Sequence, residues 1–230
     1  MKKDLTELVF ILDRSGSMSG LEQDTIGGYN SLIEKQKNEP GEAIISTVLF
    51  DDKYELLHNR ADLQNVMPIT GKEYFVRGST ALLDAIGATL NSIKNAQQGM
   101  AEEERPEKVL VAIITDGQEN SSHEYSYGKV KTLIEAQKEK GWEFLFIGAN
   151  IDAIGEAGKF GISAERAVNY SPDARGTAVV YSSVSQSIES MRRDKFVSDN
   201  WKHEIEKDHK DRAEKTDKKG FFSRFKKTKK

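Results

Sequence analysis

The stretch LVFILDRSGSMSG, residues 8–20, decides how the rest of the sequence is interpreted. Its five apolar residues, Leu8 to Leu12, form a strand-length run without polar alternation, which is typical of a strand covered on both faces. The run ends in Asp13, and serines and glycines follow at once. The stretch therefore predicts a buried strand whose carboxyl end presents one carboxylate and several hydroxyl groups.

Three further apolar runs have the same character, and they lie at residues 43–50, 109–114 and 144–148. Between the runs, apolar residues recur at helical spacing, most clearly at Leu82, Ile86, Leu90 and Ile93. Strands that alternate with helices are typical of an α/β fold. We therefore expect a Rossmann-like architecture, with a mostly parallel central sheet and helices on both faces. Residues 54–58 follow an Asp-Asp-Lys turn and predict one antiparallel edge strand beside 43–50.

The chain has 230 residues, of which 37% are hydrophobic, and this suffices for one domain with a substantial core. Val180, Val184, Ile188 and Met191 share one face of the last helix that we predict for the domain. From about Ser198 onward, charged residues dominate. We therefore predict a domain at 1–195, followed at 196–230 by a charged C-terminal helix and a basic tail that contains phenylalanine.

The charge of the chain is unevenly distributed. Seven of the 34 basic residues and none of the 37 acidic residues lie at 218–230, so residues 1–217 carry a net charge of −10. Three phenylalanines are interleaved with the basic residues of this tail, Phe221, Phe222 and Phe225. Such a segment suits contact with an anionic membrane or with a nucleic acid. A disordered tail that keeps the protein in solution accounts for the composition as well.

Several classes of protein are excluded or disfavoured. The chain contains no cysteine, which excludes disulfides and thiolate metal sites. The first residues lack the long apolar region and the cleavage site of a signal peptide, since Asp4, Glu7 and Asp13 interrupt them. No stretch approaches the roughly 20 apolar residues of a membrane span. We therefore expect a cytoplasmic protein.

Three polar loops offer the chemistry of the chain. They are DRSGS (13–17), RGSTALLDAIG (77–87) and TDGQENS (115–121), and each leaves a strand end or approaches the same rim. In open α/β sheets, ligands bind outside the carboxyl ends of the strands. The loops supply five side chains whose ligand atoms are all oxygen, namely Asp13, Ser15, Ser17, Thr80 and Asp116. An oxygen-only set favours Mg²⁺, Mn²⁺ or Ca²⁺.

At these residues the sequence resembles the von Willebrand factor type A family. The resemblance depends on D-x-S-x-S after the first strand, a distant Gly-Ser-Thr, and an Asp-Gly after a buried strand, in the family's order. It covers residues 5 to about 195. It implies that Asp13, Ser15, Ser17, Thr80 and Asp116 form a metal-ion-dependent adhesion site.

The resemblance also implies a function. Neutral hydroxyl ligands leave a bound Mg²⁺ with most of its positive charge, so that it captures an acidic residue of a partner protein in its open coordination position. We accordingly expect a metal-dependent protein-binding module and not an enzyme.

Other interpretations remain open at this point. Asp13 could instead cap a turn, with the serines bonding to the backbone. A metal-dependent hydrolase or phosphatase could use Asp13 as its nucleophile, or the chain could be a scaffold whose site is inert. A phosphate-binding P-loop and a G-x-S-x-G hydrolase elbow are excluded, because neither pattern is present.

Some residues near the three loops are expected to have ordinary roles. Arg14 and Met18 are expected at the surface, and Asp51 is expected in a solvated turn. Asp84, on the helix after Thr80, either supports the neighbouring loop from behind the ligands or is an ordinary acid on the helix surface.

Overall fold

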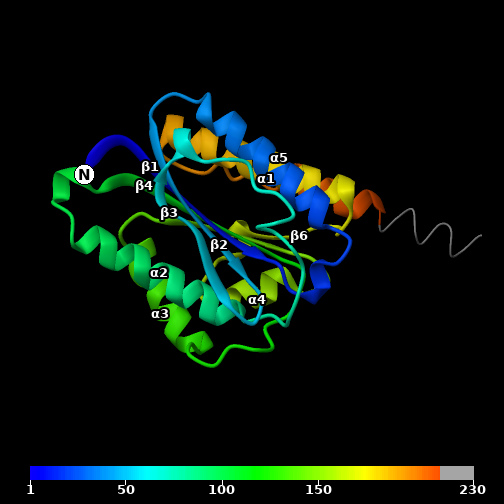
Figure 1. Cartoon of the computed structure of the whole chain (residues 1–230). Helices are drawn as coiled ribbons and strands as arrows, with labels where there is room; N and C mark the ends of the chain where they lie inside the picture. The colour runs from blue at the N-terminus through cyan, green and yellow to red at the C-terminus, as the bar shows by residue number, and fades with distance from the viewer. Residues whose placement is uncertain (213–230) are drawn as a thin grey trace, which may run out of the picture.

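A six-stranded sheet forms the centre of the molecule, in the order β3-β2-β1-β4-β5-β6 (Figure 1). The computed structural model describes residues 1–212, so the predictions for the tail at 218–230 lie outside the described residues. The strands are β1 (Lys2–Asp13), β2 (Glu42–Phe50), β3 (Tyr54–Asp62), β4 (Pro106–Thr115), β5 (Glu143–Gly148) and β6 (Ala167–Asn169). All neighbouring strands pair in parallel except β2 and β3, which are antiparallel. The mostly parallel sheet with one antiparallel edge strand is thus confirmed.

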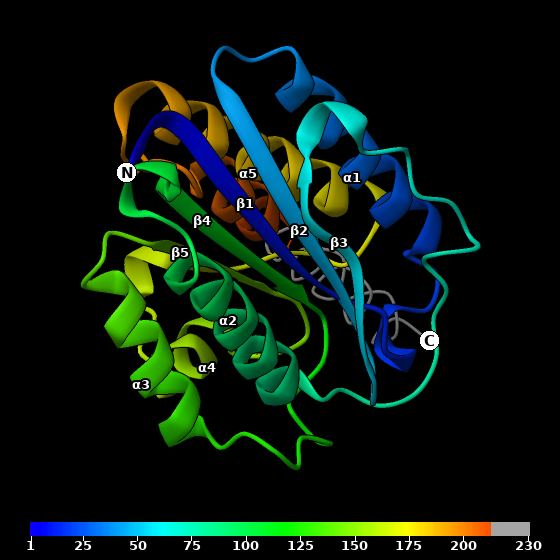
Figure 2. The ribbon, with the colours of Figure 1, turned by 60° about the vertical axis from the view of Figure 1, so that its left-hand side comes forward.

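Helices cover both faces of this sheet (Figure 2). One face carries α1 (Glu22–Lys37) and α5 (Ala174–Asp194). The other carries α2 (Leu82–Gln98), α3 (Tyr127–Lys138) and α4 (Ala153–Lys159). Within residues 1–212, no helix combines the length and the apolar character that crossing a membrane requires.

Burial on both faces explains the unbroken apolar run of β1. Leu8, Phe10 and Leu12 belong to the core under α1 and α5. Val9 and Ile11, which alternate with them, belong to the core under α2, α3 and α4. Successive side chains of a strand point to opposite faces, so a strand between two helical layers has no polar face to show.

The chain continues along the molecule after α5. Val197, Trp201 and Ile205 join the core under α1 and α5, and residues 203–212 are helical. The indole nitrogen of Trp201 donates a hydrogen bond to the carbonyl oxygen of Glu165 at 2.8 Å. The residues after position 195 therefore share a core with the body of the protein.

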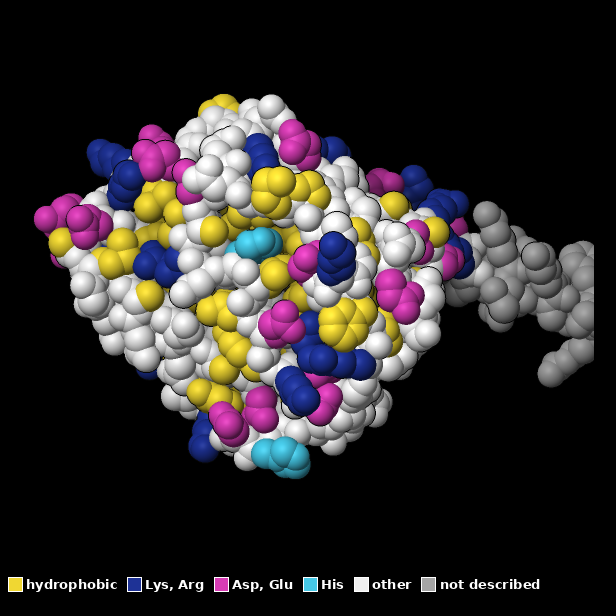
Figure 3. Space-filling view, in the orientation of Figure 1, with side chains coloured by type: hydrophobic (Ala, Val, Ile, Leu, Met, Phe, Trp, Pro, Cys, Tyr) yellow, Lys and Arg dark blue, Asp and Glu magenta, His cyan; other side chains and the backbone are white. Residues whose placement is uncertain are grey.

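The surface over β3 is mixed in character (Figure 3). Basic and acidic side chains are interspersed there with exposed apolar ones. Neither sign of charge dominates this face.

The topology sets where the polar loops meet. β1 and β4 are parallel neighbours, with Leu12 opposite Ile114, so the loops that follow them leave the same edge of the sheet. The loop before α2 reaches the same edge, where the backbone nitrogen of Ala81 donates to the carbonyl oxygen of Asp51 at 2.9 Å.

Candidate metal centre

The loop after β1 is shaped by its own aspartate. Asp13 is fully buried, and its Oδ1 accepts a hydrogen bond from the backbone nitrogen of Ser15 at 2.7 Å. Its Oδ2 accepts from the hydroxyl of Thr115, on β4, at 2.5 Å. A short 3₁₀ turn, Gly16–Met18, follows. Asp13 thereby holds the turn that presents Ser15 and ties it to the neighbouring strand.

Three hydroxyl groups meet at this turn. The Oγ atoms of Ser15 and Ser17 are 3.0 Å apart, and Thr80 donates to the Oγ of Ser15, also at 3.0 Å. Ser15 and Thr80 are buried, whereas Ser17 is exposed. The cluster is therefore buried on the side of Ser15 and Thr80 and open to solvent on the side of Ser17.

Backbone contacts hold the loop that carries Thr80 against the first loop. The backbone nitrogen of Gly16 donates to the carbonyl oxygen of Gly78 at 3.0 Å. Gly78 has φ +66°, and a Cβ placed there would lie 2.1 Å from Oδ1 of Asp52. Only glycine fits such a position without displacement of its neighbours. The backbone nitrogen of Thr80 in turn donates to Oδ1 of Asn120, in the third loop, at 2.9 Å.

Asp116 and Gly117 bring the third loop to the same point. Asp116 is 2% exposed, and its Oδ1 has no hydrogen-bond partner within residues 1–212. A Cβ on Gly117 would lie 2.8 Å from the Oγ1 of Thr80 and 2.9 Å from the Oγ of Ser17. The structure thus brings together all five side chains that the sequence singled out.

The two carboxylates are held without a cationic partner. Burial raises the pKa of Asp13, and hydrogen bonds from Thr115 and Ser15 oppose that rise. Burial also raises the pKa of Asp116 to about 6; a hydrogen bond from Ser17 opposes the rise, and the charge of Asp13 adds to it. Among the ion pairs of residues 1–212, none involves either carboxylate, since the adjacent Arg14 pairs with Asp51 and Glu55.

These features fit a hard divalent cation. The unpartnered oxygen of Asp116 and the space that a Cβ on Gly117 would fill lie beside three hydroxyl groups. Within the described residues, no group of three or more His, Cys, Asp or Glu side chains is arranged to hold a metal. Any cation here would therefore depend on Ser15, Ser17 and Thr80, together with the two aspartates.

The predicted exposure of three residues near the loops is wrong, because the structure buries Arg14, Met18 and Asp51. Nε of Arg14 lies 2.8 Å from Oδ2 of Asp51, and the Arg14 guanidinium lies 5.3 Å from the centre of the Phe75 ring. This ion pair joins the loop after β1 to the β2–β3 turn. The sequence gives no sign of it, because isolated charged residues usually lie in solvent.

Asp84 supports the third loop from behind. Its carboxylate accepts hydrogen bonds from the backbone nitrogens of residues 123, 124 and 125, at 2.8, 2.9 and 2.8 Å. Of the two interpretations of Asp84, the structure favours the supporting one. Glu119 has a similar role, since its carboxylate accepts from the backbone nitrogen of Leu83 at the start of α2.

Comparisons with known proteins identify the fold. No family model and no curated protein matches the sequence. Solved structures do match, and one of them is a von Willebrand factor type A protein from Catenulispora acidiphila (14% identity, TM-score 0.55, 80% of this chain and 42% of that one). The chain has the von Willebrand factor type A fold. This confirms the fold that the three loop motifs predicted.

Two further solved structures have a similar fold. The minor pilin PilB of Streptococcus sanguinis, as a D319A mutant, is 11% identical, with a TM-score of 0.58 over 82% of this chain and 62% of that one. Proximal thread matrix protein 1 from the mussel byssus is 17% identical, with a TM-score of 0.54 over 80% of this chain and 46% of that one. That structure is described as having a zinc-occupied MIDAS motif. The chain spans less than two thirds of the length of each of these three proteins.

Proposed function

We propose that this protein is a metal-dependent binding module in which Asp13, Ser15, Ser17, Thr80 and Asp116 hold a divalent cation. The cation would supply an open coordination position for an acidic residue of a partner protein. One observation carries the proposal. The hydroxyl of Ser15 contacts those of Ser17 and Thr80, and the nearby buried Asp116 has a carboxylate oxygen without a hydrogen-bond partner within residues 1–212.

The hydroxyl groups and the two aspartates would have different roles in holding the cation. Ser15, Ser17 and Thr80 offer neutral oxygens, which leave the charge of a cation uncompensated. Asp13 holds Ser15 in place through its hydrogen bond to the Ser15 backbone. Asp116 offers its unpartnered oxygen.

The nature of the donors supports Mg²⁺ as the cation. Five oxygen donors and no nitrogen or sulfur suit Mg²⁺, with Mn²⁺ and Ca²⁺ as alternatives. The zinc-occupied motif of the mussel protein supports a divalent ion at this place in the fold. The preference for Mg²⁺ depends on donor chemistry alone.

Binding is favoured over hydrolysis by the surroundings of Asp13. As a nucleophile, Asp13 would need to reach a substrate, yet it is fully buried and both of its oxygens accept hydrogen bonds. Turnover of a generic phosphoester in Mg²⁺, abolished by Asp13→Ala, would instead support a hydrolase.

Metal binding is the first test. Isothermal titration of the full chain with Mg²⁺ should give one site, and Thr80→Ala should weaken that site at least tenfold. Ser79→Ala is the matched control, because Ser79 lies in the same loop and bonds to Ser121 outside the cluster. At a concentration about 100 times the dissociation constant, Mg²⁺ should stabilise the fold by about 2.7 kcal/mol. Equal affinities of Thr80→Ala and the wild type would contradict the proposal.

Partner capture is the second test. The full chain should retain a partner from its source lysate in Mg²⁺, and should lose it in EDTA or with Thr80→Ala. Retention that is the same in EDTA would indicate a scaffold whose site is inert.

A further inference from the structure

The candidate metal centre opens into a cavity of about 370 Å³ whose charge is one-sided. Ser17 and Asp116 belong to its lining, and so do two further aspartates, Asp24 and Asp173. None of the lining residues is Lys or Arg. Asp116, which is only 2% exposed and whose Oδ1 has no hydrogen-bond partner within residues 1–212, lines this same cavity, and this favours the cavity as a place for a ligand.

Asp24 and Asp173 differ in their contacts. Asp173 caps the start of α5 by accepting from the backbone nitrogen of Gly176 at 2.9 Å, and it forms an ion pair with Arg212. Asp24 lies in the first turn of α1 and is partly exposed. Its carboxylate makes no hydrogen bond or ion pair with any residue of the described part of the chain. Apart from Asp116, which a cation at the centre would pair with, Asp24 is thus the acid of this cavity without a partner within residues 1–212.

This charge matters for what approaches the centre. Asp13 and Asp116 already offset part of the positive charge of a divalent cation, whose hydroxyl ligands are neutral. A cavity of about 370 Å³ is only about one Debye length across at physiological salt, so a partner's carboxylate also meets the field of Asp24. A partner that brought an acid alone would be opposed at the rim.

We infer that the partner's acidic residue is accompanied by a basic side chain, Lys or Arg, which pairs with Asp24. This inference rests on the proposed function and names the chemistry of its partner. The acid would be directed to the metal centre, and the base to the α1 side of the cavity.

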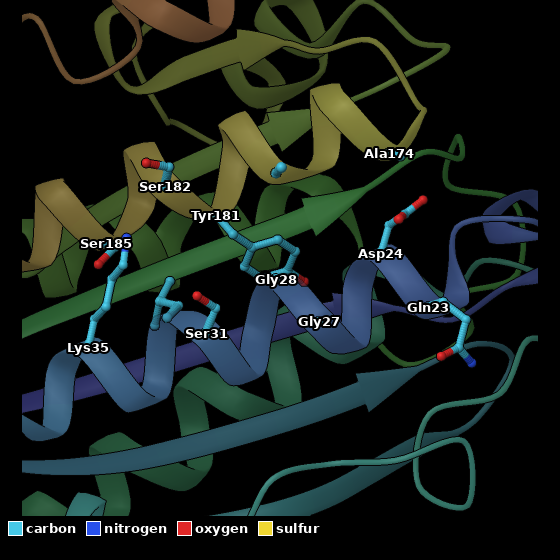
Figure 4. A pocket seen from close by; sticks show the side chains of 12 residues that line it. Gln23, Asp24, Gly27, Gly28, Ser31, Lys35, Ala174, Tyr181, Ser182 and Ser185 are labelled. Carbon is cyan, nitrogen blue, oxygen red and sulfur yellow. The ribbon is translucent and has the colours of Figure 1, made fainter.

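A second cavity provides room for that basic side chain (Figure 4). It has a volume of about 320 Å³, lies between α1 and α5, and shares Asp24 and Ala174 with the first cavity. Beyond Asp24 its lining includes small residues, among them Gly27 and Ala178, and the larger side chain of Tyr181. Lys35, which would repel a base, lies at the far end from Asp24. The aliphatic stem of a lysine or arginine can therefore lie along this groove with its charge near Asp24.

The side of the second loop carries an arginine as well as an exposed acid, Asp52. There, Arg77 lies with its Nε 2.7 Å from Oδ2 of Asp51, and its guanidinium is 5.1 Å from the centre of the Phe75 ring. A cation arriving on that side would meet a guanidinium. A base on that side would therefore be opposed by Arg77, which Asp24 does not have beside it among the residues that line its two cavities near the centre.

Binding of short peptides to the full chain, measured in the presence of Mg²⁺, tests the inference. Four capped peptides carry one aspartate each. One has only serines around it, two have a lysine two residues before or after it, and one has a glutamate in place of lysine. Dissociation constants come from NMR shift titrations, repeated in EDTA and at high salt.

We expect a lysine peptide to bind about fivefold tighter than the serine peptide, as an exposed ion pair of about 1 kcal/mol provides. High salt should reduce this preference. Asp24→Asn should abolish it while leaving Mg²⁺ affinity within about twofold. The matched control Glu34→Gln removes an exposed acid from the same helix and should retain the preference.

The two proposals fail in different ways. If no peptide binds in an Mg²⁺-dependent manner, the proposed function is overturned and the inference with it. If all four bind equally well in Mg²⁺ and not in EDTA, the function stands and the role of Asp24 is overturned. A lysine preference that survives Asp24→Asn also overturns that role.

Discussion

Asp13 and Asp116 are both buried at the end of a parallel strand, yet they do different work. Both oxygens of Asp13 accept hydrogen bonds from the protein, so this carboxylate is fixed as part of the fold. Asp116 keeps Oδ1 without a partner in the described chain. A residue type and a spacing are therefore not enough to assign a role, because the role follows from what each oxygen contacts.

Gly117 is the glycine on which the hydroxyl cluster depends most directly. Gly117→Ala would place a methyl group 2.8 Å from the Oγ1 of Thr80 and 2.9 Å from the Oγ of Ser17, and would push these hydroxyls apart. We expect Mg²⁺ affinity to fall at least tenfold by titration calorimetry. Gly128→Ala, in α3, is the control, since a Cβ there has nothing within 4 Å. It should leave affinity unchanged. Equal affinities for the two variants would show that the hydroxyls are not the ligands.

The raised pKa of Asp116 predicts how stability depends on pH without metal. Its pKa is about 6 in the folded protein and 3.8 in the unfolded reference, so the folded state holds the extra proton between these values. The stabilisation is present below pH 3.8 and is lost as pH rises through about 6. We therefore compare the free energy of unfolding of the wild type with that of Asp116→Asn in EDTA. Between about pH 4 and about pH 7, the wild-type value should fall by up to about 3 kcal/mol relative to the variant. Denaturant titrations of both proteins measure this difference, and parallel pH profiles would contradict the prediction.

At the scale of elements, the site is a junction of three loops that the sheet brings to one edge. The order β2-β1-β4 places the loops after β1 and β4 side by side, and the loop before α2 closes over them. The buried pair of Arg14 and Asp51 fastens the first loop to the β2–β3 turn, and Arg77 of the second loop joins the same carboxylate. The first two loops are thus tied to one another through the β2–β3 turn, and the hydrogen bond from the backbone nitrogen of Thr80 to Oδ1 of Asn120 ties the third loop to the second.

Removal of the buried ion pair between Arg14 and Asp51 should destabilise the fold. Asp51→Ala leaves Arg14 buried with only Glu55 as its acidic partner, and removal of one member of a buried ion pair costs about 3–5 kcal/mol. Because Glu55 remains, we expect about 3 kcal/mol in the free energy of unfolding, measured by denaturant titration. Asp52→Ala, at the exposed neighbouring position, should cost less than about 0.5 kcal/mol. Similar costs for the two variants would indicate that the pair does not hold the loops.

For the whole molecule, the segment after α5 is part of the packing. Trp201 lies in the core under α1 and α5, where it is 6% exposed. Composition places a domain boundary near residue 195, because charged residues dominate beyond it. Three apolar side chains in that charged segment nevertheless reach the core: Val197, Trp201 and Ile205.

Trp201→Ala measures how much this segment contributes. Loss of a buried tryptophan costs about 3–5 kcal/mol, and the hydrogen bond to Glu165 is lost with it. We expect differential scanning calorimetry to show a lower melting temperature for Trp201→Ala. The free energy of unfolding should fall by about 3–5 kcal/mol. His203→Ala, on an exposed position of the same segment, should melt like the wild type. If Trp201→Ala also melts like the wild type, the contacts of Trp201 with the body do not stabilise the fold.

The sequence alone determined the α/β class, the covered strands, the antiparallel edge and the five polar side chains of the candidate centre. These follow from local pattern, since an unbroken apolar run needs two covered faces and a strand end needs polar residues. Only the tertiary structure decided the burial of Arg14 and Asp51, the lack of a hydrogen-bond partner within residues 1–212 for Oδ1 of Asp116, and the acidic rim at Asp24. Each of them depends on which residues distant in the chain become neighbours, and the energy of a charge is set by those neighbours and by the water they exclude.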